Sequence, residues 1–147
     1  MRCIIQRVTN SSVTINNELC SKIEKGLLIY LAILDSDNED TIKKIVKKIV
    51  NMRIFPDSHQ KMNLSILDKK YSILVISQFT LYADCKKGNR PFFGNAAKPE
   101  HAEKIYSNVI KELNKYTICK SGKFGENMQI TSVNTGPVTI IIDSNTF

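Results

Sequence analysis

Two stretches of the chain combine side chains and backbone groups that could do chemistry. The first, Ser77-Gln78-Phe79-Thr80-Leu81, ends an apolar run and offers hydroxyls, an amide and peptide N–H groups. The second, Asn134-Thr135-Gly136-Pro137-Val138-Thr139, places a Gly-Pro step before a run of β-branched residues. Ligands of α/β proteins gather where strands end, because backbone and side-chain groups face an open crevice there. Either stretch alone is also compatible with an ordinary strand end or Gly-Pro turn.

The sequence lacks the motifs of familiar hydrolases and nucleotide-binding proteins. There is no GxSxG element, and nothing connects either histidine, His59 or His101, to Ser77. Neither GxGxxG nor GxxxxGK[ST] occurs, and Gly122-Lys123-Phe124-Gly125 is too short for a phosphate loop. Paired carboxylates are missing from both stretches. An enzyme built on them would therefore work by positioning and by backbone hydrogen bonds.

Metal-ligating residues are scattered rather than clustered. The two histidines are far apart, and the cysteines form no CxxC pair. We therefore predict no metal site and no cofactor, and we expect free, mostly buried thiols. The four cysteines are Cys3, Cys20, Cys85 and Cys119.

Composition is typical of a globular protein. The 147 residues are 42% hydrophobic and 24% charged, which excludes collagen-like, wholly disordered and disulfide-rich classes. The longest apolar run, 27–34, is much shorter than the ~20 residues of a membrane-spanning helix. The first residues alternate in polarity and lack the apolar block of a signal peptide. We expect a soluble, cytoplasmic protein with one domain over residues 1–147 and no membrane partner.

The chain is basic, with 21 lysines and arginines against 14 acidic residues and a net charge of +7. Most of the cations are lysines, which supply a diffuse positive field rather than bidentate base contacts. Such a field suits a partner that is held by its phosphates. A lysine-rich proteome would give the same excess, so charge alone leaves both interpretations open.

Hydrophobic periodicity predicts the elements that would position these residues. Apolar residues at three- and four-residue steps predict helices over 39–53 and from Pro99 onward. A loop with a weak turn of structure is expected over 56–70, and a long surface loop over 82–98. Alternating or β-branched runs predict strands over 2–8, 11–15, 18–23, 27–34, 71–79, 127–133 and 138–143. The order predicts an α/β fold, in which two main helices pack on a mixed sheet.

Five segments together resemble the D-aminoacyl-tRNA deacylase family, of the D-tyrosyl-tRNA deacylase type. The resemblance covers nearly the whole chain and implies a partly barrel-like sheet. It also implies a homodimer, with active sites at the subunit interface, that hydrolyses the ester joining a D-amino acid or glycine to tRNA. The segments are MRCIIQRVTNSSVTI at the start, SQFTL at 77–81, GNRPFF at 88–93, GKFGENMQI at 122–130 and NTGPVTI at 134–140.

The resemblance also implies roles for individual residues. Gly136-Pro137 would be a Gly-cisPro dipeptide that enters the partner's active site. There its carbonyl oxygens would accept hydrogen bonds from the substrate's ammonium, so that an L side chain is excluded while a D side chain points outward. Arg7 matches the residue that braces this dipeptide, and Phe124 and Met128 match the pocket floor.

Ser77, Gln78, Phe79 and Thr80 match the strip that holds the terminal adenosine and the ester carbonyl. A peptide N–H near Phe79 or Thr80 is our candidate oxyanion donor. Thr80 has a nucleophile's hydroxyl but no activating base, so we favour attack by water or by the ribose 2′-hydroxyl. The chain departs from the family pattern at Thr135, where many relatives have Asp, and at GNRPFF, which is commonly richer in arginine.

Two other interpretations remain at this stage. A non-catalytic tRNA- or RNA-binding module of the same fold would share the lysines, although the combination of 77–80 with Gly136-Pro137 favours an enzyme. A small-ester hydrolase without RNA is disfavoured by the positive charge and by the missing triad.

Overall fold

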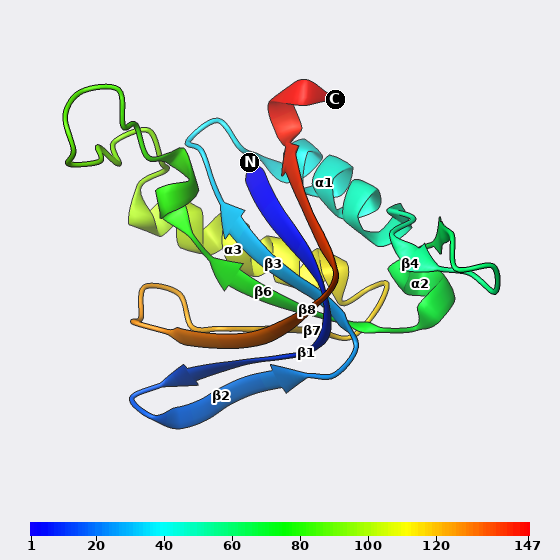
Figure 1. The fold of residues 1–147 in the computed structure, drawn as a ribbon. Helices are drawn as coiled ribbons and strands as arrows, with labels where there is room; N and C mark the ends of the chain where they lie inside the picture. Colours follow the sequence, from blue (N-terminus) through cyan, green and yellow to red (C-terminus); the bar gives the residue numbers. More distant parts are fainter.

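The computed structural model describes residues 1–147 and has a mixed sheet of six strands in the order β2-β1-β3-β6-β7, with β8 paired to β1. Strand β1 is antiparallel to β2, β3 and β8, whereas β3, β6 and β7 are parallel. Helices α1 and α3 lie together on one face of the sheet (Figure 1). The strands and helices of this layer are β1 Arg2–Ile15, β2 Glu18–Ile23, β3 Gly26–Ala32, β6 Ser72–Ser77, β7 Cys119–Ser121, β8 Gln129–Asp143, α1 Glu39–Asn51 and α3 Pro99–Leu113.

Both long helices form where the apolar period predicts them. Asn38 caps α1 by accepting hydrogen bonds from the backbone N–H groups of Asp40 and Thr41, and Pro99 opens α3 at a position that needs no N–H donor. Their apolar faces pack on β1, β3 and β6 to form the main core. The buried residues of α1 are Ile42, Ile45, Val46, Ile49 and Val50. No helix is long and apolar enough to span a membrane.

The sheet curls because β1 changes partners along its length. Residues 2–8 pair with β3, residues 11–15 pair with β2, and β8 follows both halves. The far halves of β1 and β8 thereby fold over the sheet face opposite the helices, where a second apolar cluster lies. The predicted mixed, partly barrel-like sheet with two main helices is therefore confirmed.

Two predicted chain breaks are wrong. The strands predicted at 2–8 and 11–15 are one strand, because β1 continues through residues 9 and 10 and register shifts against β8 absorb the bend. The strands predicted at 127–133 and 138–143 are likewise one strand, β8. Within β8, Asn134 pairs with Val8 and Thr139 pairs with Gln6, so residues 135–138 all lie opposite Arg7. This bulge lifts the Gly-Pro step out of the ladder.

Several short elements escaped prediction. Strand β7 is too short to show a period, and it is defined by parallel pairing to β6. The 56–70 region holds a small hairpin and a helical turn, while the strand predicted over 71–79 ends at Ser77 and gives way to a 3₁₀ turn. These elements are β4 Phe55–Pro56, β5 Met62–Leu64, α2 Ile66–Lys69, η1 Phe79–Tyr82 and η2 Ser144–Thr146.

All four cysteines are free, but only two of them are buried. Cys20 and Cys85 are exposed, so the expectation of mostly buried thiols is half right. Burial raises the pKa of the Cys3 and Cys119 thiols to about 12, which keeps both protonated at neutral pH.

Candidate active site

A pocket of about 340 Å³ opens at the carboxyl end of β6, between η1 and the start of α3. The backbone N–H of Ala97 donates to the carbonyl of Ile33 at 2.9 Å, which fixes the segment before α3 against the end of β3. The pocket is lined by Leu31, Ala32, Ile33, Ser77, Gln78, Phe79, Phe93, Ala96, Ala97, Pro99, Ala102, Phe124 and Gly125.

Ser77 and Gln78 of the predicted 77–80 strip form the polar edge of this pocket. Gln78 still holds to the sheet, since its N–H donates to the Leu31 carbonyl at 2.8 Å, and its side-chain Nε2 donates to Thr80 Oγ1 at 2.6 Å. Because η1 begins at Phe79, the peptide N–H groups of Phe79 and Thr80 have no acceptor within the turn or elsewhere in the chain. These two donors are available to an oxygen of a bound molecule.

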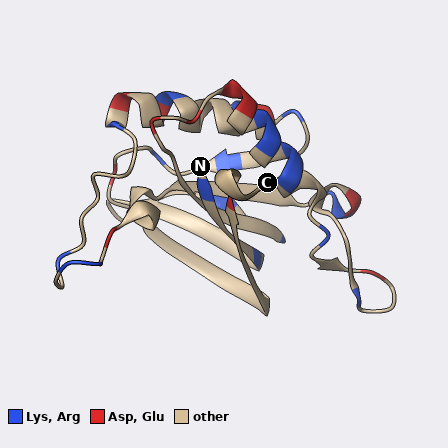
Figure 2. Ribbon diagram, turned by 90° about the horizontal axis from the view of Figure 1, so that it is seen from above, with Lys and Arg blue, Asp and Glu red and all other residues tan.

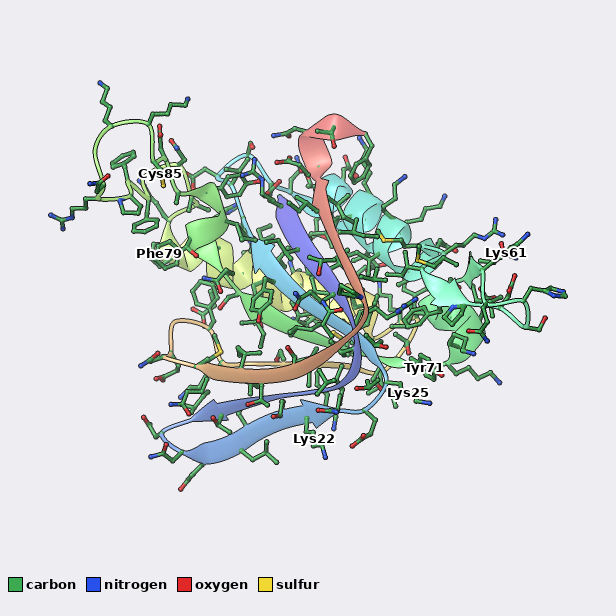
Figure 3. All side chains as sticks on the ribbon, in the orientation of Figure 1. Lys22, Lys25, Lys61, Tyr71, Phe79 and Cys85 are labelled. Carbon is green, nitrogen blue, oxygen red and sulfur yellow. The ribbon has the colours of Figure 1, made fainter.

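Phe79 projects at the mouth of the pocket. Its side chain is 57% exposed, and its ring meets that of Phe93 edge to face at 5.3 Å. Figure 3 places Phe79 on the same side of the molecule as Cys85 in the long loop. Thr80 does not line the pocket wall. The structure therefore brings Ser77, Gln78 and Phe79 into one cavity and leaves the Thr80 hydroxyl beside it.

Only one of the two residues predicted for the pocket floor lines the pocket. Phe124 lines the pocket, and its ring lies 5.8 Å from that of Tyr106. The Tyr106 hydroxyl donates to the Val75 carbonyl at 2.8 Å, and burial raises its pKa, so it is a neutral donor that fixes this wall. Met128 packs instead against the second apolar cluster and does not line the cavity.

The lining of the pocket carries no charged side chain. None of its lining side chains is titratable, and its only polar side chains are Ser77 and Gln78. The pocket wall of one chain therefore supplies no general base or acid, although it can supply hydrogen bonds and a close-fitting apolar surface.

Gly136 and Pro137 lie on the bulge of β8 and are exposed. Their peptide bond is cis, and Gly136 has a φ of 122°, which disfavours an L side chain. Arg7 supports the bulge from below: its Nε donates to the Thr135 carbonyl at 3.2 Å and its Nη1 to the Ile54 carbonyl at 2.6 Å. A Cβ on Gly136 would lie 2.7 Å from Arg7 Nη2.

The dipeptide does not line the pocket of its own chain. Arg7 and Thr135 instead border a separate groove of about 230 Å³ with Lys25, Lys69 and Tyr71. At position 135 the main-chain carbonyl makes the contact to Arg7, so Thr in place of Asp leaves that contact intact.

Sequence reasoning missed the wall formed by Phe93 and the small residues Ala96, Ala97 and Ala102. Alanine carries no chemical signal, and the 82–98 segment has no period. Phe93 lay within the GNRPFF segment that carried part of the resemblance, but no role was assigned to it.

Comparison with known proteins places the chain in a family. The family model described as D-Tyr-tRNA(Tyr) deacylase matches residues 4–143. A D-aminoacyl-tRNA deacylase of Halothermothrix orenii is 48% identical over 99% of this chain and 98% of its own, and one of Thermosipho africanus is 45% identical over 98% and 97%. A solved structure titled c-Myc DNA Unwinding Element Binding Protein has a TM-score of 0.92 and 40% identity, and covers 97% of this chain and 98% of its own. The chain belongs to the D-Tyr-tRNA(Tyr) deacylase family and is a hydrolase of that family.

Proposed function

We propose that this protein hydrolyses the ester of D-aminoacyl-tRNA in a site that two subunits complete. One observation carries the proposal: the pocket holds donors for an oxyanion but no titratable side chain, while Gly136-Pro137 stands exposed, away from the pocket of its own chain. In a two-fold dimer, each copy would place its Gly136-Pro137 dipeptide at the pocket of the other copy.

The open face of the sheet supplies a surface for that dimer. Ile4 on β1 pairs with Tyr30 on β3 and with Ile141 on β8, so the three side chains form one cross-strand row. Tyr30 of this row packs against the second apolar cluster, on the face away from the helices, and Ile141 is 67% exposed. Strand β8 is also unpaired along one edge. We take this partly exposed apolar row as the interaction surface, because exposed apolar side chains that adjoin one another are typical of such surfaces.

Chirality would be read by main-chain oxygens. The carbonyls of Gly136 and Pro137 suit an α-ammonium group, which is a donor of charge-assisted hydrogen bonds. With the ammonium and the ester both fixed, the side chain of a D-amino acid points to solvent, while that of an L-amino acid meets the dipeptide. Glycine has no side chain to exclude, so its ester would be accepted too.

Hydrolysis would rest on the peptide N–H groups of Phe79 and Thr80. Donors placed where negative charge develops lower the barrier of acyl transfer without any proton transfer by the protein. The attacking group would be water, or the ribose 2′-hydroxyl would assist, because no base lies near Thr80. Met128, which packs beside Gly122 rather than in the cavity, would act only through that packing.

Non-catalytic binding of nucleic acid is the second candidate. It is favoured by the net charge of +7, and the solved relative at 40% identity is titled as a DNA unwinding element binding protein. Lysine and arginine colour α1 and the tip of the long loop in Figure 2. Because aminoacyl-tRNA belongs to the translation apparatus, the deacylase function would place the protein in the cytoplasm.

Release of labelled amino acid from a matched pair of D- and L-tyrosyl-tRNA separates the two functions. We expect a deacylase to release the D-amino acid at least about a hundred-fold faster than the L-amino acid. This ratio corresponds to a steric penalty of about 2.7 kcal/mol against the L-amino acid. Equal rates for both enantiomers, or release no faster than in buffer, contradict the proposal. Arg7→Lys tests the support of the bulge, because lysine cannot bridge two carbonyls as arginine does.

A further inference from the structure

The loop of residues 84–94 carries aromatic and cationic side chains that the proposed chemistry does not use. It projects beside η1, whose first residue, Phe79, lines the pocket (Figure 1). Its base is held by backbone pairing, in which the Asp84 and Phe92 N–H groups donate to each other's carbonyls at 2.8 and 2.9 Å. Asp84 Oδ1 also accepts from the Lys86 N–H at 2.9 Å. The loop is therefore a closed hairpin with a defined direction.

The tip of this hairpin is a cluster of free cations. Lys86, Lys87 and Arg90 are exposed, and none of them takes part in any of the five ion pairs of the structure. Asp84 is the only acidic residue of the 84–94 loop, and its carboxylate is committed to the turn. Figure 2 shows the blue tip extending away from the body of the protein. Cations without internal partners are available to an anionic ligand.

Phe92 lies between this tip and the pocket. It is 62% exposed, yet its ring rests on the backbone of Gly94, where an added Cβ would lie 2.2 Å from the ring's Cζ atom. Glycine at position 94 therefore leaves room for the tip of the ring against the chain. The next residue, Phe93, lines the pocket mouth against Phe79. Cations, an exposed ring and the pocket thus follow one another along a short path.

We propose that the 84–94 loop binds the unpaired nucleotides that precede the substrate's terminal adenosine. Phe92 would stack on one base, and Lys86, Lys87 and Arg90 would hold the phosphates. Stacking on an aromatic ring combined with phosphate neutralisation is how proteins bind single-stranded nucleic acid without reading its sequence. A duplex would not serve, because its bases are already stacked on one another. The inference rests on the proposed function, since it places the reacting ester in the adjacent pocket.

Hydrolysis of two substrates separates this loop from the catalytic site. We would compare D-tyrosyl-tRNA with D-tyrosyl-adenosine, which carries the same ester but lacks the preceding nucleotides. Stacking on one base is worth ~1–3 kcal/mol, so Phe92→Ala should raise KM for the tRNA at least about five-fold. On D-tyrosyl-adenosine its kcat/KM should stay within about two-fold of wild type. Phe92→Tyr, which keeps the ring, should restore the tRNA KM.

Gly94→Ala provides a second variant that keeps the phenylalanine but displaces its ring. Like Phe92→Ala, it should raise KM for the tRNA. An equal loss on both substrates, or a Phe92→Leu variant as good as Phe92→Tyr, would overturn the stacking role. Wild-type protein that is inactive on both substrates would instead refute the proposed function, whatever the loop does.

Binding of a short single-stranded oligoribonucleotide tests the loop without catalysis. Replacing Lys86, Lys87 and Arg90 by Ala should weaken binding and reduce the slope of log K against log salt by about 2, which is the share of three phosphate contacts. The charge-matched control replaces Lys61, Lys104 and Lys111, which are exposed and take no part in an ion pair. Equal effects of the two triple variants, or equal affinity for a duplex, would contradict a specific single-strand site.

Discussion

At the scale of single residues, the Thr80 hydroxyl separates two possible mechanisms. Its only side-chain partner is Gln78 Nε2, and no titratable side chain lines the neighbouring pocket. An unactivated hydroxyl is a poor nucleophile. Thr80→Ala should therefore keep kcat for D-tyrosyl-tRNA within about ten-fold of wild type, as measured by single-turnover release. Thr80→Ser is the matched control, because it keeps the hydroxyl; an Ala variant near the uncatalysed rate beside an active Ser variant would make Thr80 the nucleophile.

Gly136 is the residue at which a single methyl group should matter most. The added Cβ would lie 2.7 Å from Arg7 Nη2 and 2.9 Å from Val138 Cγ2, at a φ of 122°. We expect Gly136→Ala to lower the free energy of unfolding by about 1–3 kcal/mol and D-tyrosyl-tRNA turnover at least about ten-fold, because the bulge must shift. Gly88→Ala is the control for backbone strain, since its φ is 68° with nothing within 4 Å. Because Gly88 lies in the 84–94 loop, turnover of the two variants is compared on D-tyrosyl-adenosine, which does not reach that loop. Urea denaturation measures the free energy of unfolding of both variants. If both are folded and lose turnover equally, Gly136 has no special role in the reaction.

At the scale of elements, prediction from the sequence succeeded where a period is long. The helix beginning at Glu39 and the buried strand β3 follow directly from their apolar patterns. The short strand β7 could not be predicted, because it exists only through pairing with β6. The bulge at 135–138 could not be predicted either, because a Gly-Pro step is common both in a turn between two strands and in a bulge within one strand. Only the pairing with β1 shows that residues 135–138 form a bulge opposite Arg7.

The same limit applies to the site. The 77–80 strip was recognisable because hydroxyls and an amide follow an apolar run, and Phe124 was found only through the resemblance. Their meeting in one pocket depends on how β6 and α3 pack, which no local pattern encodes. That Gly136 does not line the pocket of its own chain is likewise visible only in the three-dimensional structure.

An exposed isoleucine on strand β8 leads to a prediction about the dimer. Ile141 is 67% exposed in the row it forms with Ile4, on the face proposed for the dimer. Ile141→Asp would bury an unpaired carboxylate there, at a cost of several kcal/mol, so the dimer Kd should rise at least about a hundred-fold. Analytical ultracentrifugation measures this directly. Ile118→Asp, at a site that is 63% exposed beside β7, is the control; dissociation by both variants, or by neither, would place the interface elsewhere.

At the scale of the whole molecule, the net charge of +7 should govern tRNA affinity. Lysines exchange condensed counterions for phosphates, so log K should fall linearly with log salt. We expect affinity for uncharged tRNA to drop at least about ten-fold between 50 and 200 mM salt, as measured by filter binding. An affinity that hardly responds to salt would mean that the lysines do not contact the phosphates.

Mixing two variants of low activity tests most directly whether two chains complete one site. Gly136→Ala keeps the pocket and damages the dipeptide, whereas the double variant Gln78→Ala/Phe79→Ala keeps the dipeptide and damages the pocket. In a refolded equimolar mixture, half of the dimers are mixed and each has one intact site, so about a quarter of wild-type D-tyrosyl-tRNA hydrolysis should return. Activity no greater than the sum of the two variants measured apart would contradict the shared site.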